Sequence, residues 1–232
     1  MIPWSLLDTA QMPGDGGELR LLRRGSEFSI RLGRYELMNS RRGGSEEALA
    51  TLACERIRSR ERPGILIGGL GMGFTLRAAL VALGAGARIV VAELVPAVVG
   101  WARGPMGEVF GKSLTDPRVD IRETDVAHLI GRGPSAYDAI LLDVDNGPEG
   151  LTRKANDALY GLEGLSRARA ALRPGGVLGV WSPDANSNFT RRLRKAEFEV
   201  EEVRARAGGS RGARHVIWIA SRADRGRQSP DR

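Results

Sequence analysis

Cysteine and histidine are nearly absent from this chain. Its 232 residues include one cysteine, Cys54, and two histidines, His128 and His215. A single cysteine excludes an internal disulfide and a thiolate-bound metal cluster, and two histidines do not suffice for a histidine-rich metal site. We therefore expect no metal and a reducing, cytoplasmic setting. We also expect His128 to be non-catalytic and His215, at the start of the last strand, to be structural.

Long apolar runs and aromatic clusters are lacking too. No stretch approaches the ~20 apolar residues that span a bilayer, and the N-terminus lacks the basic start and apolar core of a signal peptide. The net charge is +7 and the pI about 10.4, but the arginines are scattered among acids. No aromatic residues interleave with them to form a stacking platform. We expect neither a membrane nor a nucleic-acid partner, although an RNA methyltransferase stays an alternative.

Two nucleotide-binding fingerprints are also missing. The chain has no G-x-x-x-x-G-K-[ST] loop, which disfavours ATP and GTP, and its glycines at 69, 71 and 73 do not match G-x-G-x-x-G, which disfavours NAD and FAD. These glycines lie between an apolar strand and an amphipathic helix, where the backbone can approach a ligand closely. A nucleoside cofactor without a pyrophosphate remains, and S-adenosylmethionine is the commonest. The alternative is that the glycines only allow close strand–helix packing.

From residue 64 onward, strand and helix patterns alternate. This order predicts an α/β fold, a Rossmann-like seven-stranded methyltransferase sheet whose last two strands form an antiparallel edge hairpin. Predicted strands cover residues 64–68, 88–93, 119–122, 138–143, 176–181, 199–204 and 215–220, and predicted helices cover 74–83, 96–103, 126–131, 155–172 and 188–196.

The remaining segments divide the chain. We expect residues 1–44 to form an N-terminal arm, over 1–16, followed by a small β meander. The transferase domain covers residues 45–221, with Ser45 as the N-cap of its first helix. Residues 222–232 form a disordered basic tail.

Polar side chains follow the strands at the edge where an open α/β sheet binds ligands. Glu93 ends the second strand, where its carboxylate can accept hydrogen bonds from ribose hydroxyls. Asp125 follows the third strand and can bind an adenine amino group. Asp143 and Asp145 follow the fourth strand and are the best catalytic candidates. The predicted cofactor-binding residues are Gly69, Gly71, Gly73, Glu93, Leu94, Asp125, Val126 and Asp143, with Leu94 or Val126 packing on the adenine.

Some of these residues have plainer interpretations. Asp125 can simply cap the helix that follows it. Asp145 lies in Asp145-Asn-Gly-Pro148, which is ordinary turn chemistry. Trp181 and Ser182 end the fifth strand and are candidates for lining the substrate pocket, although Trp181 is equally suited to the core.

Together these landmarks resemble the spermidine synthase family, the polyamine aminopropyltransferases. The resemblance extends from Phe28 through the glycine loop to the segment Leu172-Arg-Pro-Gly-Gly-Val177. It implies a small N-terminal β domain, a methyltransferase-like domain and a homodimer. It also implies that Glu93 holds the ribose, that Asp125 holds the adenine, and that Asp143 takes a proton from the attacking amine.

The chain departs from this family at three places. Met72 stands where the family's glycine loop has an aspartate that grips the amine of decarboxylated S-adenosylmethionine. The helix that starts Ser45-Glu-Glu-Ala-Leu-Ala50 lacks the family's Tyr-His pair. The active-site loop reads Asp143-Val-Asp-Asn-Gly-Pro148 instead of D-S-x-D-P.

We therefore expect a transferase that uses an S-adenosylmethionine-type cofactor and acts on a small, amine-containing acceptor. Because Met72 is neutral, methyl transfer from S-adenosylmethionine is the first prediction. Aminopropyl transfer from decarboxylated S-adenosylmethionine to a polyamine is the alternative, and a non-catalytic cofactor-binding scaffold is a further one.

Overall fold

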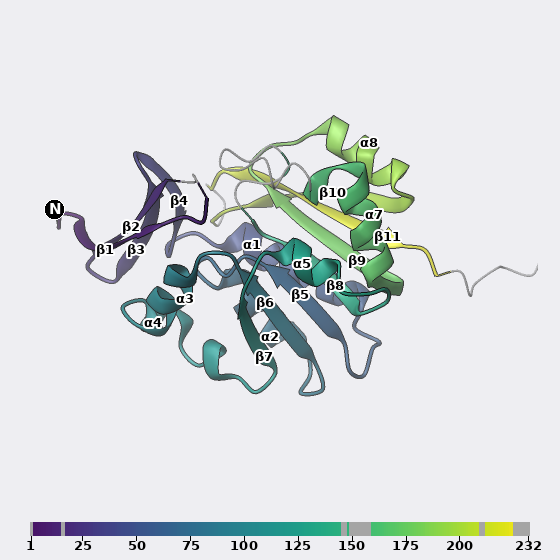
Figure 1. Cartoon of the computed structure of the whole chain (residues 1–232), viewed down its shortest axis with the longest axis horizontal. Helices are drawn as coiled ribbons and strands as arrows, with labels where there is room; N and C mark the ends of the chain where they lie inside the picture. The colour runs from purple at the N-terminus through teal and green to yellow at the C-terminus, as the bar shows by residue number, and fades with distance from the viewer. Residues whose placement is uncertain (1, 15–16, 145–147, 149–158, 209–211, 225–232) are drawn as a thin grey trace, which may run out of the picture.

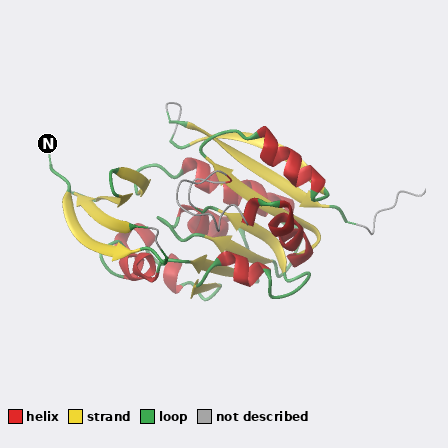
Figure 2. Cartoon of the chain, turned by 45° about the horizontal axis from the view of Figure 1, so that its top comes forward, coloured by secondary structure: helices red, strands yellow, loops and turns green. Residues whose placement is uncertain are grey.

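The fold is a seven-stranded sheet covered by helices on both faces, with a separate four-stranded sheet at the N-terminus (Figures 1 and 2). We obtained it as a computed structural model, which describes residues 2–14, 17–144, 148, 159–208 and 212–224. Among these, no helix combines the length and apolar composition needed to cross a membrane.

The large sheet has the strand order β10-β11-β9-β8-β5-β6-β7. Strands β5 to β9 pair in parallel, and β11 pairs antiparallel with both β9 and β10. The predicted fold class and the antiparallel edge hairpin are therefore confirmed. The strands are β5 (Gly64–Gly68), β6 (Arg88–Glu93), β7 (Val119–Glu123), β8 (Tyr137–Leu142), β9 (Leu172–Ser182), β10 (Phe198–Arg206) and β11 (Arg214–Arg222).

Two hydrophobic cores lie on opposite faces of this sheet. The central strands are buried on both sides, as shown by Ile65, Leu66 and Ile67, each fully enclosed, and such continuous apolar runs are typical of parallel strands between helical layers. One face is covered by α1 (Gly44–Arg56), α2 (Phe74–Ala82), α3 (Pro96–Arg103) and the short α4 (Gly107–Phe110), and the other by α5 (Val126–Ile130), α7 (Leu162–Ala171) and α8 (Ser187–Lys195). A 3₁₀ turn at Ser113–Thr115 precedes β7.

The N-terminal sheet contains the β meander that the sequence predicts and, in addition, a strand within the predicted arm. It is an antiparallel meander of β1 (Ser5–Gln11), β2 (Glu18–Arg24), β3 (Glu27–Leu32) and β4 (Tyr35–Asn39). The prediction of an arm over residues 1–16 is wrong for β1, which pairs with β2. Nearly all β1 side chains are exposed, so backbone pairing defines the strand and leaves no alternating apolar pattern to detect.

Other element boundaries also differ from the prediction. Helix α7 begins at Leu162, and residues 155–158 of the predicted helix lie outside the described residues. Strand β9 begins at Leu172 instead of at residue 176, because residues 173–176 form a bulge within it: Tyr137 pairs with Leu172 and Ala139 with Val177. Strand β11 runs to Arg222, the first residue of the predicted tail, whose residues 225–232 lie outside the described part.

Candidate functional site

A cleft lies beyond the carboxyl ends of β5, β6 and β8, between the large sheet and the N-terminal sheet. It encloses about 780 Å³ of empty space, part of it open to solvent. Its walls include residues from the N-terminal meander, such as Leu37 and Met38, so the small sheet completes the site. The predicted residues that line it are Gly69, Gly71, Glu93, Leu94, Asp125, Val126 and Asp143.

The glycine loop has a backbone that only glycine adopts readily. Gly69, Gly71 and Gly73 have φ angles of +90°, +49° and +72°, in the region that L side chains avoid. A Cβ on Gly69 would lie 2.4 Å from the Asp143 carbonyl oxygen, and one on Gly73 would lie 2.5 Å from the Phe110 ring. The packing interpretation thus accounts for Gly69 and Gly73, while Gly69 and Gly71 also line the cleft.

Glu93 fixes the glycine loop to the end of β6. One carboxylate oxygen accepts a hydrogen bond from the Leu70 amide and the other from the Val95 amide, both at 2.9 Å. The residue is nearly buried but keeps 8% of its surface exposed. These contacts fix the orientation of the carboxylate at the edge of the cleft that it lines. The ribose role of Glu93 stays a prediction.

Asp125 serves the helix that follows it and also lines the cleft. Its Oδ1 accepts a hydrogen bond from the Ala127 amide at 2.8 Å and so caps α5. The plainer interpretation is therefore correct. Because Asp125, Val126 and Leu94 also line the cleft, the predicted adenine contact remains compatible with the geometry.

Asp143 lies where this cleft joins a second one. Its amide donates to the Gly68 carbonyl at 3.0 Å, and the Thr75 hydroxyl donates to its Oδ2 at 2.7 Å. Burial of the carboxyl group, and secondly the charge of Glu46, raise the pKa of Asp143 to about 7, against the opposing Thr75 hydrogen bond. Near neutral pH this carboxyl group therefore exists in both protonation states.

Glu46 is the acidic residue that sequence reasoning missed. The N-cap of α1 is Gly43, not Ser45 as predicted, so Ser45 and Glu46 lie inside the first turn. Glu46, Met72, Asp143 and Trp181 line the second cleft, which encloses about 570 Å³. Burial is the main cause that raises the pKa of Glu46, with the neighbouring Glu47 adding to it. From sequence, an acid in a first helical turn indicates only a favourable helix dipole.

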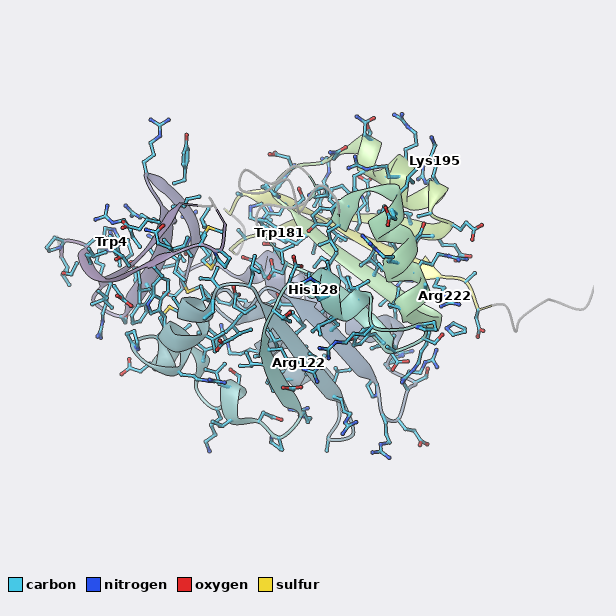
Figure 3. The ribbon with its side chains drawn as sticks, in the orientation of Figure 1. Trp4, Arg122, His128, Trp181, Lys195 and Arg222 are labelled. Atoms are coloured by element: carbon cyan, nitrogen blue, oxygen red, sulfur yellow. The ribbon has the colours of Figure 1, made fainter. Side chains whose placement is uncertain are left out.

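A hydrogen-bonded group lies behind Glu46. The Ser45 hydroxyl lies 2.5 Å from Glu46 Oε2 and 2.8 Å from His215 Nδ1, and it accepts a hydrogen bond from Trp181 Nε1 at 3.0 Å. The Trp181 and His215 rings meet edge to face, 4.8 Å apart. Trp181 lies at the end of β9 nearest the N-terminal sheet, whereas His128 is exposed on α5 (Figure 3). His215 is therefore tied to the site, which its position in the sequence did not indicate.

Asp145, the second catalytic candidate, lies outside the described residues. Met72 is nearly buried and lines the second cleft with Glu46, so a neutral thioether and a carboxylate face the same space.

Comparisons with known proteins support the resemblance seen in the sequence. No protein-family model matches the chain. Polyamine aminopropyltransferase 2 of Pseudomonas aeruginosa is 32% identical over 120 residues, which cover 50% of this chain and 32% of that protein. The match thus spans about a third of the length of the curated relative.

Solved structures show the same fold at low sequence identity. The spermidine synthase of Thermotoga maritima superposes with a TM-score of 0.75 at 18% identity, covering 94% of this chain and 73% of that one. A spermidine synthase in complex with the transition state analogue AdoDATO gives 0.76, with 18% identity and coverage of 94% and 74%. Human methyltransferase-like protein 13, in complex with SAH, gives 0.57, with 18% identity and coverage of 81% and 83%. The chain is therefore similar to spermidine synthases and has a methyltransferase-like fold.

Proposed function

We propose that this chain transfers an aminopropyl group from decarboxylated S-adenosylmethionine to a small amine. The observation that carries the proposal is the pair of carboxylates, Asp143 and Glu46, that face the second cleft beside the glycine loop. A site with two acids and an aromatic wall suits cationic amines. The match of half of this chain to part of a curated aminopropyltransferase supports the same choice.

The first cleft has the groups that an adenosyl moiety needs. Glu93 ends β6 with a fixed carboxylate for the ribose, and Leu94 and Val126 offer apolar surface beside Asp125 for the adenine. When bound, the sulfonium cofactor supplies an electrophilic carbon. The two clefts share Gly71 and Asp143, so we infer that the acceptor approaches from the second cleft along the Asp143 side.

Glu46 can supply the negative charge that Met72 lacks. Decarboxylated S-adenosylmethionine carries an ammonium group that needs an acid, and at the expected loop position this chain has a neutral thioether. Because Glu46 and Met72 line the same cleft, we infer that Glu46 supplies the negative charge from helix α1 instead. This shift of the acid is why aminopropyl transfer is preferred here over the methyl transfer expected from the sequence.

Asp143 has the properties of a general base. An ammonium group must lose a proton before its nitrogen can attack as a nucleophile. A general base that accepts this proton works best when its pKa lies near the working pH. Burial and Glu46 bring the pKa of Asp143 to about 7. The Thr75 hydroxyl holds Oδ2 at 2.7 Å, so in this proposal Oδ1 accepts the amine proton.

Methyl transfer is the second candidate, and Met72 is the observation that favours it. The glycine-loop amides at the start of α2 can face the carboxylate of S-adenosylmethionine, which the decarboxylated form lacks. On this candidate the protein binds S-adenosylmethionine more tightly.

Product analysis separates these candidates. The purified protein is incubated with each cofactor and a series of diamines, and products are identified by mass spectrometry. Aminopropylated amine formed from decarboxylated S-adenosylmethionine, and lost in Asp143→Asn, is the expected result. Methylated amine formed only from S-adenosylmethionine would establish the second candidate. Cofactor binding without product from either cofactor would favour a non-catalytic cofactor-binding scaffold. Methylation of RNA and of no amine would favour an RNA methyltransferase.

Glu46→Gln provides the matched test of the acid. The variant keeps the side-chain shape and removes the charge. We expect it to weaken binding of decarboxylated S-adenosylmethionine by about tenfold, because one charge-assisted contact is lost. The affinity for S-adenosylmethionine should change little. Equal losses for both cofactors would remove Glu46 from this role.

A further inference from the structure

We propose that Ser45 and His215 form a proton-exit path from the acidic pair to the protein surface. The path runs from Glu46 through the Ser45 hydroxyl to His215. It rests on the proposed function, in which Asp143 accepts an amine proton in each cycle and must release it. In this proposal the proton passes from Asp143 to the ionised Glu46 across the cleft that both residues line, which leaves Asp143 ionised and Glu46 protonated.

The contacts that form this path come from three elements that are distant in the sequence. Ser45 is fully buried in the first turn of α1, Trp181 ends β9, and His215 is near the start of β11. The Ser45 hydroxyl lies 2.5 Å from Glu46 Oε2 and 2.8 Å from His215 Nδ1. Glu46 faces the cleft that also contains Asp143, and His215 is half-buried, so the group links the cleft to solvent.

Hydrogen-bond capacity couples the two ends of the path. A serine hydroxyl donates one hydrogen bond and accepts two. Since Trp181 donates to Ser45, only two arrangements use all the contacts. With Glu46 ionised, Ser45 donates to Glu46 and His215 Nδ1–H donates to Ser45. With Glu46 protonated, Glu46 donates to Ser45 and Ser45 donates to a bare His215 Nδ1.

The second arrangement holds one proton more than the first, and a concerted shift releases it. The Glu46 proton moves to Ser45 Oγ while the Ser45 proton moves to His215 Nδ1, which leaves Glu46 ionised and His215 doubly protonated. Loss of the Nε2 proton to water then restores the first arrangement. No covalent bond other than O–H and N–H bonds changes, and no co-reactant is needed.

The charges around the path fit this direction of transfer. Glu46 and Asp143 line the same cleft. Burial is the main effect that raises the pKa of Glu46 and so favours its protonated form, and the neighbouring Glu47 on α1 adds to it, against the opposing hydrogen bond from Ser45. At the other end, Asp184 in the loop after β9 favours a charged His215, while burial opposes that charge and is the larger effect on the His215 pKa. A His215 that charges only briefly is suited to passing a proton on.

A merely structural role predicts a different response to substitution. In His215→Asn the amide can take the place of Nδ1 and keep the bond to Ser45, but it cannot carry a proton. We expect this variant to lower turnover by about tenfold, with KM little changed. This is less than the roughly 10²–10⁴-fold loss expected when the general base itself is removed. Added imidazole should restore turnover in proportion to its concentration. His128→Gln, on the exposed face of α5, is the matched control and should behave as the wild type.

Full turnover in His215→Asn without imidazole would overturn the path and leave His215 as a packing residue. A defect that no buffer restores would equally overturn it, since it would indicate lost positioning. Ser45→Ala should show the same dependence on imidazole if it folds. If the wild type makes no product with any cofactor, the proposed function has failed, and the path is then judged by a measurement that needs no activity.

Nitrogen-15 NMR of the histidine side chains provides that measurement. The protein has only two histidines, and His128→Gln assigns their signals. At a pH where Glu46 is ionised and His215 neutral, the path requires the Nδ1–H tautomer of His215, and Ser45→Ala should abolish this preference. A wild-type His215 fixed as the Nε2–H tautomer under those conditions would overturn the proposal, because Ser45 would then have no proton to share with Glu46.

Discussion

Replacing Asp143 by asparagine should make the protein more stable at neutral pH. Its pKa rises from 3.8 to about 7, mainly because burial disfavours the carboxylate. A carboxyl group whose pKa is higher in the folded state contributes stability that is complete below 3.8 and is lost as the pH rises through about 7. At about 1.36 kcal/mol for each pH unit, this loss amounts to about 4 kcal/mol. Asparagine resembles the protonated acid and does not ionise.

Urea denaturation of the wild type and Asp143→Asn tests this reasoning. The free energy of unfolding of the two proteins should be similar at low pH, and the variant should become progressively more stable as the pH rises through about 7. Taking the difference between the two curves removes the titration of the groups that do not interact with Asp143. Parallel curves across the whole range would refute the claim that Asp143 is held in an unfavourable charged state. Asp143 would then not be poised as a base near neutral pH.

The remaining predictions concern activity, binding and assembly. Asp143→Asn should lower turnover by about 10²–10⁴-fold while cofactor affinity by calorimetry stays nearly unchanged; near-normal turnover would make Asp143 structural. Glu93→Gln should weaken cofactor binding by tenfold or more, since charge-assisted hydrogen bonds contribute about 1.5–3 kcal/mol each, and unchanged affinity would remove Glu93 from the site. Side-by-side titration of the two cofactors should show tighter binding of decarboxylated S-adenosylmethionine, because Glu46 replaces the loop acid. Tighter binding of S-adenosylmethionine would instead favour methyl transfer, as the neutral Met72 indicates. Light scattering should show a dimer that deletion of residues 1–40 disrupts, because Leu6 and Leu7 of the edge strand β1 are exposed; a monomeric intact chain would contradict this.

The sequence predicted the large sheet well because its signals are local. The apolar run before Gly69 and the acid at Glu93 are each read within a few residues, and strand ends gather at one edge of a parallel sheet by topology alone. Strand β1 escaped prediction because it buries almost none of its side chains. The predicted start of β9 at residue 176 was too late, because glycine and proline signal an irregular backbone and do not distinguish a bulge within a strand from a loop before it.

The contacts around Ser45 could not be predicted for a different reason. Ser45 and His215 are 170 positions apart in the sequence, and Ser45 and Trp181 are 136 apart. Only the pairing of β11 with β9 and the packing of α1 against β9 bring these residues together. A serine followed by acids predicts a helix cap, and in this chain Gly43 occupies that position.

Met72 and Glu46 show how a departure from a family pattern can mislead. Met72 alone indicates that the site has lost its acid, and that loss favours a cofactor with its own carboxylate. On the proposed function, a negative charge must face the ammonium group of the cofactor, and an element other than the glycine loop can supply it. Helix α1 packs against α2, and the Thr75 hydroxyl oxygen lies 3.3 Å from the Glu46 backbone carbonyl oxygen, so the first turn of α1 lies beside the loop. The Glu46 side chain on that turn lines the same cleft as Met72, the residue that stands at the position of the loop acid. The charge of this cleft is therefore a property of two packed elements, and neither motif reveals it when read alone.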